Sequence, residues 1–287
     1  MSSSFLRRPL GALLAFMGAA VLSGCGGGAL QDNGGVFVSS MGATTASYGR
    51  TMTVVLSGSG FNKGVNVTLD SGCGAVTEVS GGTDQSRSFS CKVNALGTLT
   101  ARALTTKGLE VGRLQITIPQ PEVTLLVTGA SATMQTLVMQ LDPAKAPISV
   151  MNFLDYVNAG FYRSTIFHRV IKDFVIQAGG YTSGPVVKVA TSPAITLESN
   201  NGLSNLRGTV AMARTSDFNS ATSQFYINTV DNTSLDYKSA TDPGYAVFGK
   251  VITGLDVVDS IAGVATRFDL GSGLMNLPVT DVAVSYT

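Results

Sequence analysis

Few side chains in this chain are suited to nucleophilic or metal chemistry. It has one histidine, His168, and three cysteines, and it contains no CxxC pair, no HExxH and no GxSxG segment. A zinc site or a hydrolase triad needs several such residues at fixed spacing. The sequence therefore argues against a metal-dependent or triad hydrolase, and we expect neither a metal nor another cofactor.

Four segments in the second half of the chain combine aromatic, aliphatic and a few polar side chains. They read FYRSTIFHRVIKDFVIQAGG at residues 161–180, RGTVAMAR at 207–214, SQFYIN at 223–228 and GYAVFGKV at 244–251. In this order and at this spacing they resemble the signature segments of the cyclophilin-type peptidyl-prolyl cis-trans isomerases. The resemblance covers about residues 122–287, and it implies rotation about X–Pro bonds in proline-containing polypeptides.

Such a rotation makes and breaks no covalent bond. The partial double bond of the peptide sets a barrier of about 18–20 kcal/mol, so unaided X–Pro isomerisation is slow. A cationic donor fixed near the prolyl nitrogen stabilises the twisted amide more than the planar one, which is what raises the rate. The resemblance places Arg169 there, and arginine keeps its charge at physiological pH. The alternative for Arg169 is a surface salt bridge.

The resemblance also assigns the residues around Arg169 by their motif positions. Gln177 is expected to act beside Arg169 in catalysis by hydrogen-bonding the substrate backbone. His168 is expected to pack and hydrogen-bond beside the groove as a structural residue. The residues expected to bind substrate, most of them lining an apolar slot for the proline ring, are Phe174, Val175, Met212, Ala213, Gln224, Tyr226, Leu235 and Tyr245.

Three positions depart from the family pattern. Val175 stands where methionine is common, and Tyr226 adds a hydroxyl where phenylalanine is usual. Ser234 precedes Leu235 at a place that often holds an aromatic residue. These departures keep open an alternative: a module that holds proline-containing segments as a chaperone or scaffold with little turnover. In a third hypothesis, the protein acts at a surface through residues 36–119.

The elements that must position these residues are mostly strands. Apolar and β-branched runs predict strands at residues 123–127, 135–141, 208–214, 224–229, 246–251 and 279–285, with a mixed apolar stretch at 166–177. A helix is expected from Pro147, ending near Gly160, and a shorter one after Thr253 as N-cap. Closure removes exposed strand edges, so residues 120–287 are predicted to form an eight-stranded closed β-barrel capped by two helices.

The first half of the folded chain reads as β throughout. Short β-branched runs at residues 51–56, 66–69, 88–93, 98–104 and 113–118 are separated by glycine-containing turns. This spacing predicts a β-sandwich over residues 36–119, which loosely resembles bacterial immunoglobulin-like domains. Pro119-Gln120-Pro121 forms a stiff boundary. The fold class is therefore mainly β, with a sandwich followed by a barrel.

The N-terminal residues have the features of an export signal. Arg7 and Arg8 precede an apolar stretch that ends in small residues, so residues 1–24 read as a signal peptide. Leu22-Ser23-Gly24-Cys25 resembles the bacterial lipobox, which implies a lipid on Cys25, residues 25–35 as a tether, and attachment to the periplasmic face of the outer membrane. The alternative is an ordinary signal peptide with an incidental Cys25.

Lipidation would leave Cys73 and Cys91 as an even pair in an exported chain. A disulfide is then expected, the alternative being two free buried thiols. The formal net charge of +1, with only 13% charged residues, gives no basis for nucleic-acid binding. We expect a monomer whose partners are proline-containing polypeptides and, through the lipid, a membrane.

Overall fold

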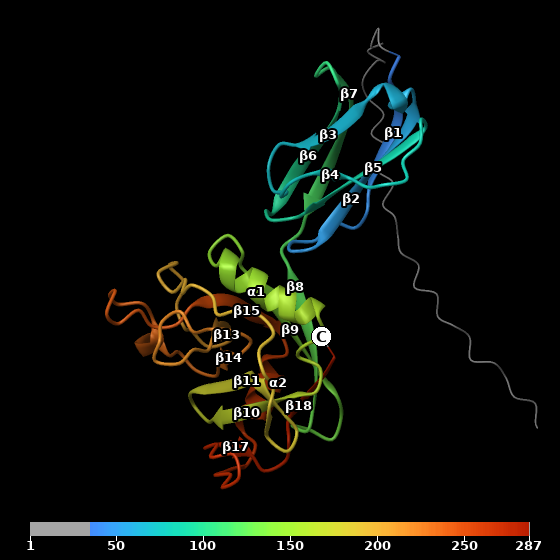
Figure 1. The fold of residues 1–287 in the computed structure, drawn as a ribbon. Coiled ribbons are helices and arrows are strands. Elements are labelled where there is room, and N and C mark those ends of the chain that lie inside the picture. The colour runs from blue at the N-terminus through green and yellow to red at the C-terminus, as the bar shows by residue number, and fades with distance from the viewer. Residues whose placement is uncertain (1–34, 287) are drawn as a thin grey trace, which may run out of the picture.

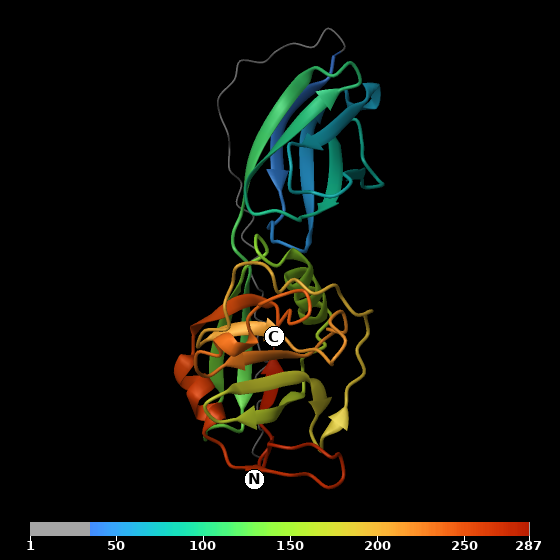
Figure 2. The ribbon, with the colours of Figure 1, turned by 90° about the vertical axis from the view of Figure 1, so that its left-hand side faces the viewer.

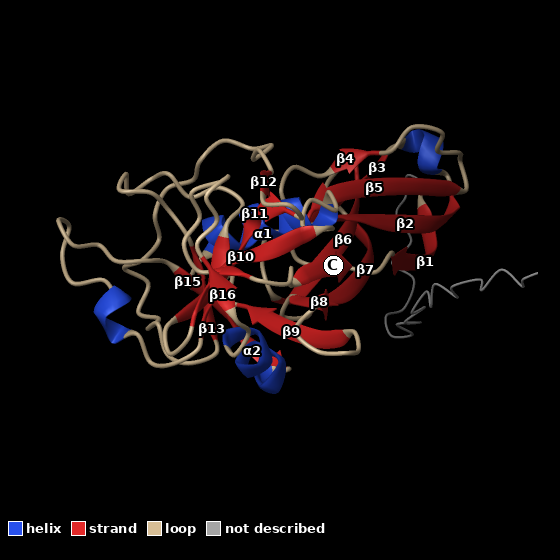
Figure 3. Cartoon of the chain, turned by 90° about the horizontal axis from the view of Figure 1, so that it is seen from below, coloured by secondary structure: helices blue, strands red, loops and turns tan. Residues whose placement is uncertain are grey.

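The computed structural model describes residues 35–286. The predicted signal peptide, the lipidation site Cys25 and nearly all of the tether lie outside the described residues. Within them the chain is mainly β, with two α-helices (Figure 3). Figure 1 shows two lobes joined end to end, with the first seven strands in one and the remaining elements in the other. No helix among the described residues is long and apolar enough to cross a bilayer.

The N-terminal lobe contains two antiparallel sheets. One has the order β1 (Phe37–Ala43), β2 (Thr51–Ser59), β5 (Ser86–Lys92), β4 (Thr77–Glu78), and the other β3 (Val65–Leu69), β6 (Gly97–Thr105), β7 (Glu110–Ile118). Alternate residues of both sheets, such as Met52 and Val54 on β2 and Leu99 and Ala101 on β6, are buried in one apolar cluster. Two sheets sharing a core is the arrangement of a β-sandwich. The strands β1 and the two-residue β4 were not predicted from the sequence.

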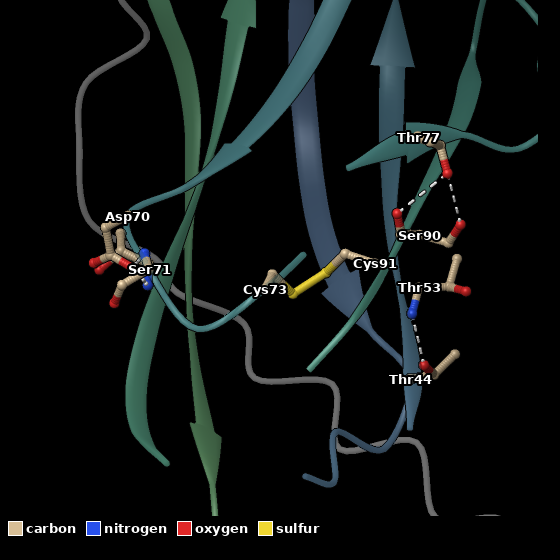
Figure 4. Close-up of a disulfide and its surroundings, with 9 residues drawn as sticks. Thr44, Thr53, Asp70, Ser71, Cys73, Thr77, Ser90 and Cys91 are labelled. Carbon is tan, nitrogen blue, oxygen red and sulfur yellow. Dashed lines mark hydrogen bonds between the residues drawn. A yellow bond between two sulfur atoms is a disulfide. The ribbon is translucent and has the colours of Figure 1, made fainter. Parts of the chain in front are cut away.

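A disulfide joins Cys73 and Cys91, with their Cα atoms 5.7 Å apart (Figure 4). Cys73 follows β3 of the second sheet, and Cys91 lies on β5 of the first. The bond therefore ties the loop leaving one sheet to a strand of the other. The predicted pairing is confirmed, and the alternative of two free thiols is wrong.

The C-terminal lobe is a closed antiparallel barrel of eight strands, as predicted. Its strands are β8 (Glu122–Thr128), β9 (Gln135–Leu141), β10 (Thr165–Ile171), β11 (Val175–Thr182), β13 (Thr209–Met212), β14 (Phe225–Asn228), β15 (Val247–Thr253) and β18 (Ala283–Tyr286). They pair in the order β10, β18, β8, β9, β15, β13, β14, β11, and β11 pairs back to β10. A short strand, β12 (Val186–Val187), pairs with the last two residues of β11, Tyr181 and Thr182.

Two helices pack against the barrel. On α1 (Pro147–Asn158), Phe153 is fully buried and its ring contacts those of Tyr162, Phe225 and Phe248. The second helix, α2 (Leu255–Ala262), buries Val257, Val258 and Ile261. The predicted N-cap Thr253 is wrong. Thr253 ends β15, and Gly254 precedes the helix with φ of 89°, a left-handed conformation that glycine adopts without strain.

The two lobes meet around the Pro119-Gln120-Pro121 segment. Gln120 Nε2 donates a 2.9 Å hydrogen bond to the carbonyl of Leu141, which fixes the junction to β9. Two polar contacts reach from the first lobe to helix α1: Arg50 with Asn158 at 2.6 Å, and Lys92 with Asp155 at 3.3 Å.

Candidate active site

One row of residues crosses five strands of the barrel. Arg169 on β10 lies opposite Gln177 on β11, and Gln177 lies opposite Tyr226 on β14. Tyr226 lies opposite Ala211 on β13, which in turn lies opposite Val247 on β15. Directly opposed residues of antiparallel strands place their side chains on the same face. The barrel therefore aligns a cation, an amide and three apolar side chains from distant parts of the sequence.

The apolar end of this row forms a small cluster that is separate from the main core of the protein. Its buried members are Val175, Ala211, Tyr226 and Val247, and the partly buried side chains Phe174, Leu203, Ala213, Leu235 and Tyr245 pack against them. Six of these nine were predicted to bind substrate. An apolar cluster outside the main core, with a partly exposed rim, is a surface against which an apolar ring can pack. We call these nine residues the slot.

Met212 is the predicted slot residue that the structure places elsewhere. Its side chain is buried in the main core cluster and is 1% exposed. Successive side chains of a strand point to opposite faces. Ala211 and Ala213 face the slot, so Met212 between them faces the barrel interior. The prediction that Met212 lines the slot is therefore wrong, and strand alternation would have assigned Ala211 in its place.

Arg169 lies at the edge of the slot. Its guanidinium carbon is 5.9 Å from the centre of the Phe174 ring, and the side chain is partly exposed. No carboxylate within residues 35–286 forms an ion pair with it. A guanidinium that no carboxylate neutralises keeps its donors for another group. The surface salt bridge considered from sequence is absent from the described part of the chain.

The two predicted glutamines contact each other. Gln177 Nε2 donates a 2.9 Å hydrogen bond to Gln224 Oε1. The Gln224 amide lies against Gly180, where an added Cβ would come within 2.6 Å of it. Glycine at this position therefore leaves room for the glutamine that orients Gln177 beside Arg169.

Comparison with known proteins places this site in a family. The family described as cyclophilin type peptidyl-prolyl cis-trans isomerase/CLD matches residues 126–282. This chain belongs to the cyclophilin family. It is 54% identical over 143 residues to peptidyl-prolyl cis-trans isomerase A of Dickeya dadantii, covering 50% of this chain and 72% of that protein. It is also 54% identical over 143 residues to peptidyl-prolyl cis-trans isomerase B of Escherichia coli, covering 49% and 85%.

A solved cyclophilin type peptidyl-prolyl cis-trans isomerase of Cryptosporidium parvum, in the presence of the dipeptide Ala-Pro, is also similar. It covers 58% of this chain and 96% of its own, with 24% identity and a TM-score of 0.47. The matches to the isomerases of Dickeya dadantii and Escherichia coli span about half of this chain, and the family match over residues 126–282 lies in the C-terminal lobe.

The single histidine of this cyclophilin is buried. His168 is 3% exposed, and its ring centre is 4.7 Å from that of Tyr181. Burial lowers the pKa of His168 to about 4, because the charged form loses its solvation. The ring is therefore neutral at pH 7, which agrees with a structural role beside the groove and not with that of a cationic donor.

A buried hydrogen-bond network under the slot was not predicted. The Tyr226 hydroxyl donates to Asn205 Oδ1 at 2.7 Å, and Asn228 Nδ2 also donates to that oxygen, at 3.3 Å. Asn205 is fully buried. Tyr226 stands where the family usually has phenylalanine, and its additional hydroxyl thus has a hydrogen-bond partner. A buried hydroxyl requires a hydrogen-bond partner, so the tyrosine at position 226 was the one sequence signal that such a network exists.

The same network reaches the segment of the slot that carries Leu235. Asn205 donates to Asp236 Oδ1 from its backbone at 2.7 Å and from Nδ2 at 2.9 Å, and Asp236 directly follows Leu235. Burial raises the pKa of Asp236, but hydrogen bonds from Ser204 and Asn205 outweigh it and hold that pKa below its ordinary value.

A second buried amide extends the network to Phe174. Asn232 Nδ2 donates to the Phe174 carbonyl and to Asn228 Oδ1, both at 2.8 Å. Through Asn205, Asn228 and Asn232, buried amides hold Phe174, Tyr226 and the Leu235 segment in one arrangement.

Arg214, the last residue of the segment RGTVAMAR, provides a second cation at the slot, and no role was predicted for it from the sequence. Its guanidinium carbon is 4.5 Å from the centre of the Tyr245 ring, and its Nη2 donates to the Gly244 carbonyl at 2.8 Å. The Tyr245 ring in turn meets Tyr226 edge-on, with centres 5.8 Å apart. Arg214 therefore fixes the aromatic wall formed by Tyr245.

Proposed function

We propose that this cyclophilin accelerates cis-trans rotation of X–Pro bonds in exported polypeptides, with Arg169 stabilising the twisted amide. The observation that carries the proposal is the Arg169 guanidinium at the edge of an apolar slot, with no carboxylate among the described residues paired to it. A proline ring held in the slot has its nitrogen on the Arg169 side. Twisting the amide frees the lone pair of that nitrogen, and the guanidinium donates to it.

The energies fit a direct but partial contribution of Arg169 to the acceleration. A charge-assisted hydrogen bond contributes about 1.5–3 kcal/mol, which corresponds to about 10- to 150-fold in rate. The rest of the acceleration must come from the slot, which holds the ring, and from Gln177, which holds the chain. Relatives named peptidyl-prolyl cis-trans isomerase, at 54% identity, support the assignment.

We further propose that the protein works at the cell envelope. The support is the sequence before the described residues: an export signal followed by a lipobox-like Leu22-Ser23-Gly24-Cys25. The disulfide between Cys73 and Cys91 fits an oxidising compartment. Metabolic labelling of the expressed chain with a radioactive fatty acid tests the anchor, with Cys25→Ser as control. Equal labelling of both would overturn lipidation at this residue.

The test of the activity is the isomerisation rate of a short Ala-Pro peptide, followed by NMR exchange. The purified chain should accelerate it, and Arg169→Ala should lower kcat/KM by at least tenfold. Arg207→Ala is the matched control, because Arg207 is an exposed arginine paired with Asp259 at 2.7 Å, and it should leave the rate unchanged. A wild-type rate equal to that of buffer would overturn the enzyme proposal.

The same assay distinguishes an isomerase from the alternative, a binding module with little turnover. Ser234, where an aromatic residue often sits, leaves the wall near Leu235 without a ring. A module of this kind would bind the peptide, measured by fluorescence anisotropy, and yet not change its exchange rate.

A further inference from the structure

A hairpin stands beside the strand that carries Arg169. It comprises residues 266–278, with β16 (Thr266–Arg267) paired to β17 (Leu277–Pro278). The first half of β10 pairs with β18 through Ile166 and Ala283. In its second half, the Val170 N–H instead donates to the Asn276 carbonyl at 2.9 Å. The hairpin therefore takes the position next to β10, on the side of Arg169 opposite to Gln177 and the slot.

Internal bonds hold the tip of this hairpin in one shape. Asp269 accepts hydrogen bonds from the Ser272 N–H at 2.9 Å and from its hydroxyl at 2.7 Å, and it pairs with Arg267 at 3.0 Å. The Gly273 N–H donates to the Asp269 carbonyl at 2.8 Å. The two charges of the tip are thus paired with each other, and bonds within the hairpin define the turn.

The hairpin displays apolar side chains to solvent. Leu270 is 88% exposed, Met275 67% and Phe268 54%, and Val279, just after β17, is 57% exposed. Figure 2 shows this segment, in red, as a loop extending below the barrel. A set of large apolar side chains exposed together on an ordered loop is typical of an interaction surface.

We infer that the hairpin binds apolar side chains of an extended client segment close to the target proline, so that the enzyme prefers unfolded, apolar polypeptides. This inference rests on the proposed function. Neighbouring strands lie about 4.8 Å apart and an extended chain advances about 3.3 Å per residue. A chain that leaves the slot past Arg169 therefore reaches β17 and β16 within about two to four residues. Because Arg267 and Asp269 neutralise each other, the surface suits an apolar and uncharged segment.

The experiment compares three proline peptides on the full mature chain. One is a short Ala-Pro peptide. The other two are long peptides, with leucine and phenylalanine or with serine at positions two to five on both sides of the proline. The variant Phe268→Ser/Leu270→Ser/Met275→Ser tests the hairpin. The matched control Val186→Ser/Val189→Ser removes side chains that are 60% and 77% exposed on or just after β12.

We expect wild type to bind the apolar peptide about fivefold more tightly than the serine peptide, as burial of part of two or three apolar side chains allows. The hairpin variant should lose this preference, whereas it keeps kcat/KM on the short peptide. The β12 variant should keep both. Circular dichroism and the short-peptide rate verify that the variants fold.

A preference that persists in the hairpin variant, or that disappears equally in the β12 variant, overturns the inference. The inference is also overturned if the three side chains are needed for self-association or for binding to lipid vesicles but not for peptide affinity. Failure of the proposed function is a separate outcome. If wild type accelerates no peptide, anisotropy still reports whether the hairpin selects apolar segments.

Discussion

The Tyr226 hydroxyl donates a 2.7 Å hydrogen bond to the fully buried Asn205. Tyr226→Phe should therefore lower the free energy of unfolding by about 1 kcal/mol, the usual contribution of one hydrogen bond. Asn205→Ala should cost about 2–4 kcal/mol, because it leaves the Tyr226 hydroxyl without its acceptor and removes a donor to Asp236. Urea unfolding of both variants measures these losses.

The double variant distinguishes a direct contact from two independent defects. If Asn205 orients Tyr226, the two losses should fall short of additivity by about 0.5–1.5 kcal/mol. Asn205→Ala should also raise KM more than it lowers kcat, because a displaced Tyr226 weakens the slot. Asn219→Ala, in a loop away from this network, is the control. Strict additivity together with an unchanged KM would show that Asn205 does not position the slot.

The pH dependence of the rate should be flat near neutrality. Burial lowers the pKa of His168 to about 4 and raises that of Tyr226, and arginine stays charged. None of these groups changes charge between pH 6 and 8, so kcat/KM on a short Ala-Pro peptide should vary by less than about twofold there. A clear inflection near the ordinary histidine pKa of about 6.5 would instead give His168 a direct role.

Stability, in contrast, should depend on pH through His168. Its folded pKa, about 4, lies below the unfolded value of 6.5, so the unfolded state takes up the proton first as pH falls. The stabilisation is fully present above about pH 6.5 and is lost toward pH 4, by roughly 2 kcal/mol between pH 7 and 4.5. His168→Gln should remove this component. The free energy of unfolding, measured with urea at pH 7 and at pH 4.5, should therefore differ less in the variant than in wild type. Equal pH dependence in wild type and variant would contradict the buried neutral histidine.

The sequence was sufficient for much of this site because the cyclophilin segments fix which strands carry which residues. Phe174, Val175, Ala213, Tyr226, Leu235 and Tyr245 were assigned by motif position, and the structure brings all six into one slot. The prediction for Met212 failed because it followed motif position alone and did not take account of the alternation of side chains along β13.

The slot residue Leu203 and the two buried asparagines of the network beneath the slot needed information that spacing does not carry. Leu203, Asn205 and Asn232 lie outside the four segments, in stretches with no regular structure. Only the folded chain shows that Asn205 meets the Tyr226 hydroxyl, 21 residues away in sequence. The N-cap Thr253 failed for a similar reason: β15 continues to that residue through its pairing with Val138, so the helix starts after Gly254 instead.

The disulfide should stabilise the N-terminal lobe without affecting the site. The bond closes a loop of 18 residues, so Cys73→Ala/Cys91→Ala should lower the free energy of unfolding of this lobe by about 3 kcal/mol. The row from Arg169 to Val247 lies entirely in the barrel, and the variant should keep the wild-type rate on a short peptide. Calorimetry with and without reductant, beside the rate assay, measures both. A loss of rate in parallel with the loss of stability would mean that the lobes fold as one unit.

Arg214 should affect substrate affinity through Tyr245. Its guanidinium carbon lies 4.5 Å from the Tyr245 ring centre, and its Nε and Nη2 both donate to the Gly244 carbonyl. Arg214→Ala removes a cation–π contact of about 0.5–2 kcal/mol, so we expect KM to rise by about 2- to 30-fold. Because Arg214 does not lie in the row with Arg169, kcat should change little.

Arg214→Lys is the informative control: it keeps the charge but loses the planar guanidinium that stacks on Tyr245 and donates two hydrogen bonds. If lysine restores the full wild-type KM, charge alone matters and the stacking role is wrong; if both variants lower kcat tenfold with KM unchanged, Arg214 belongs to the catalytic step and not to the wall of the slot.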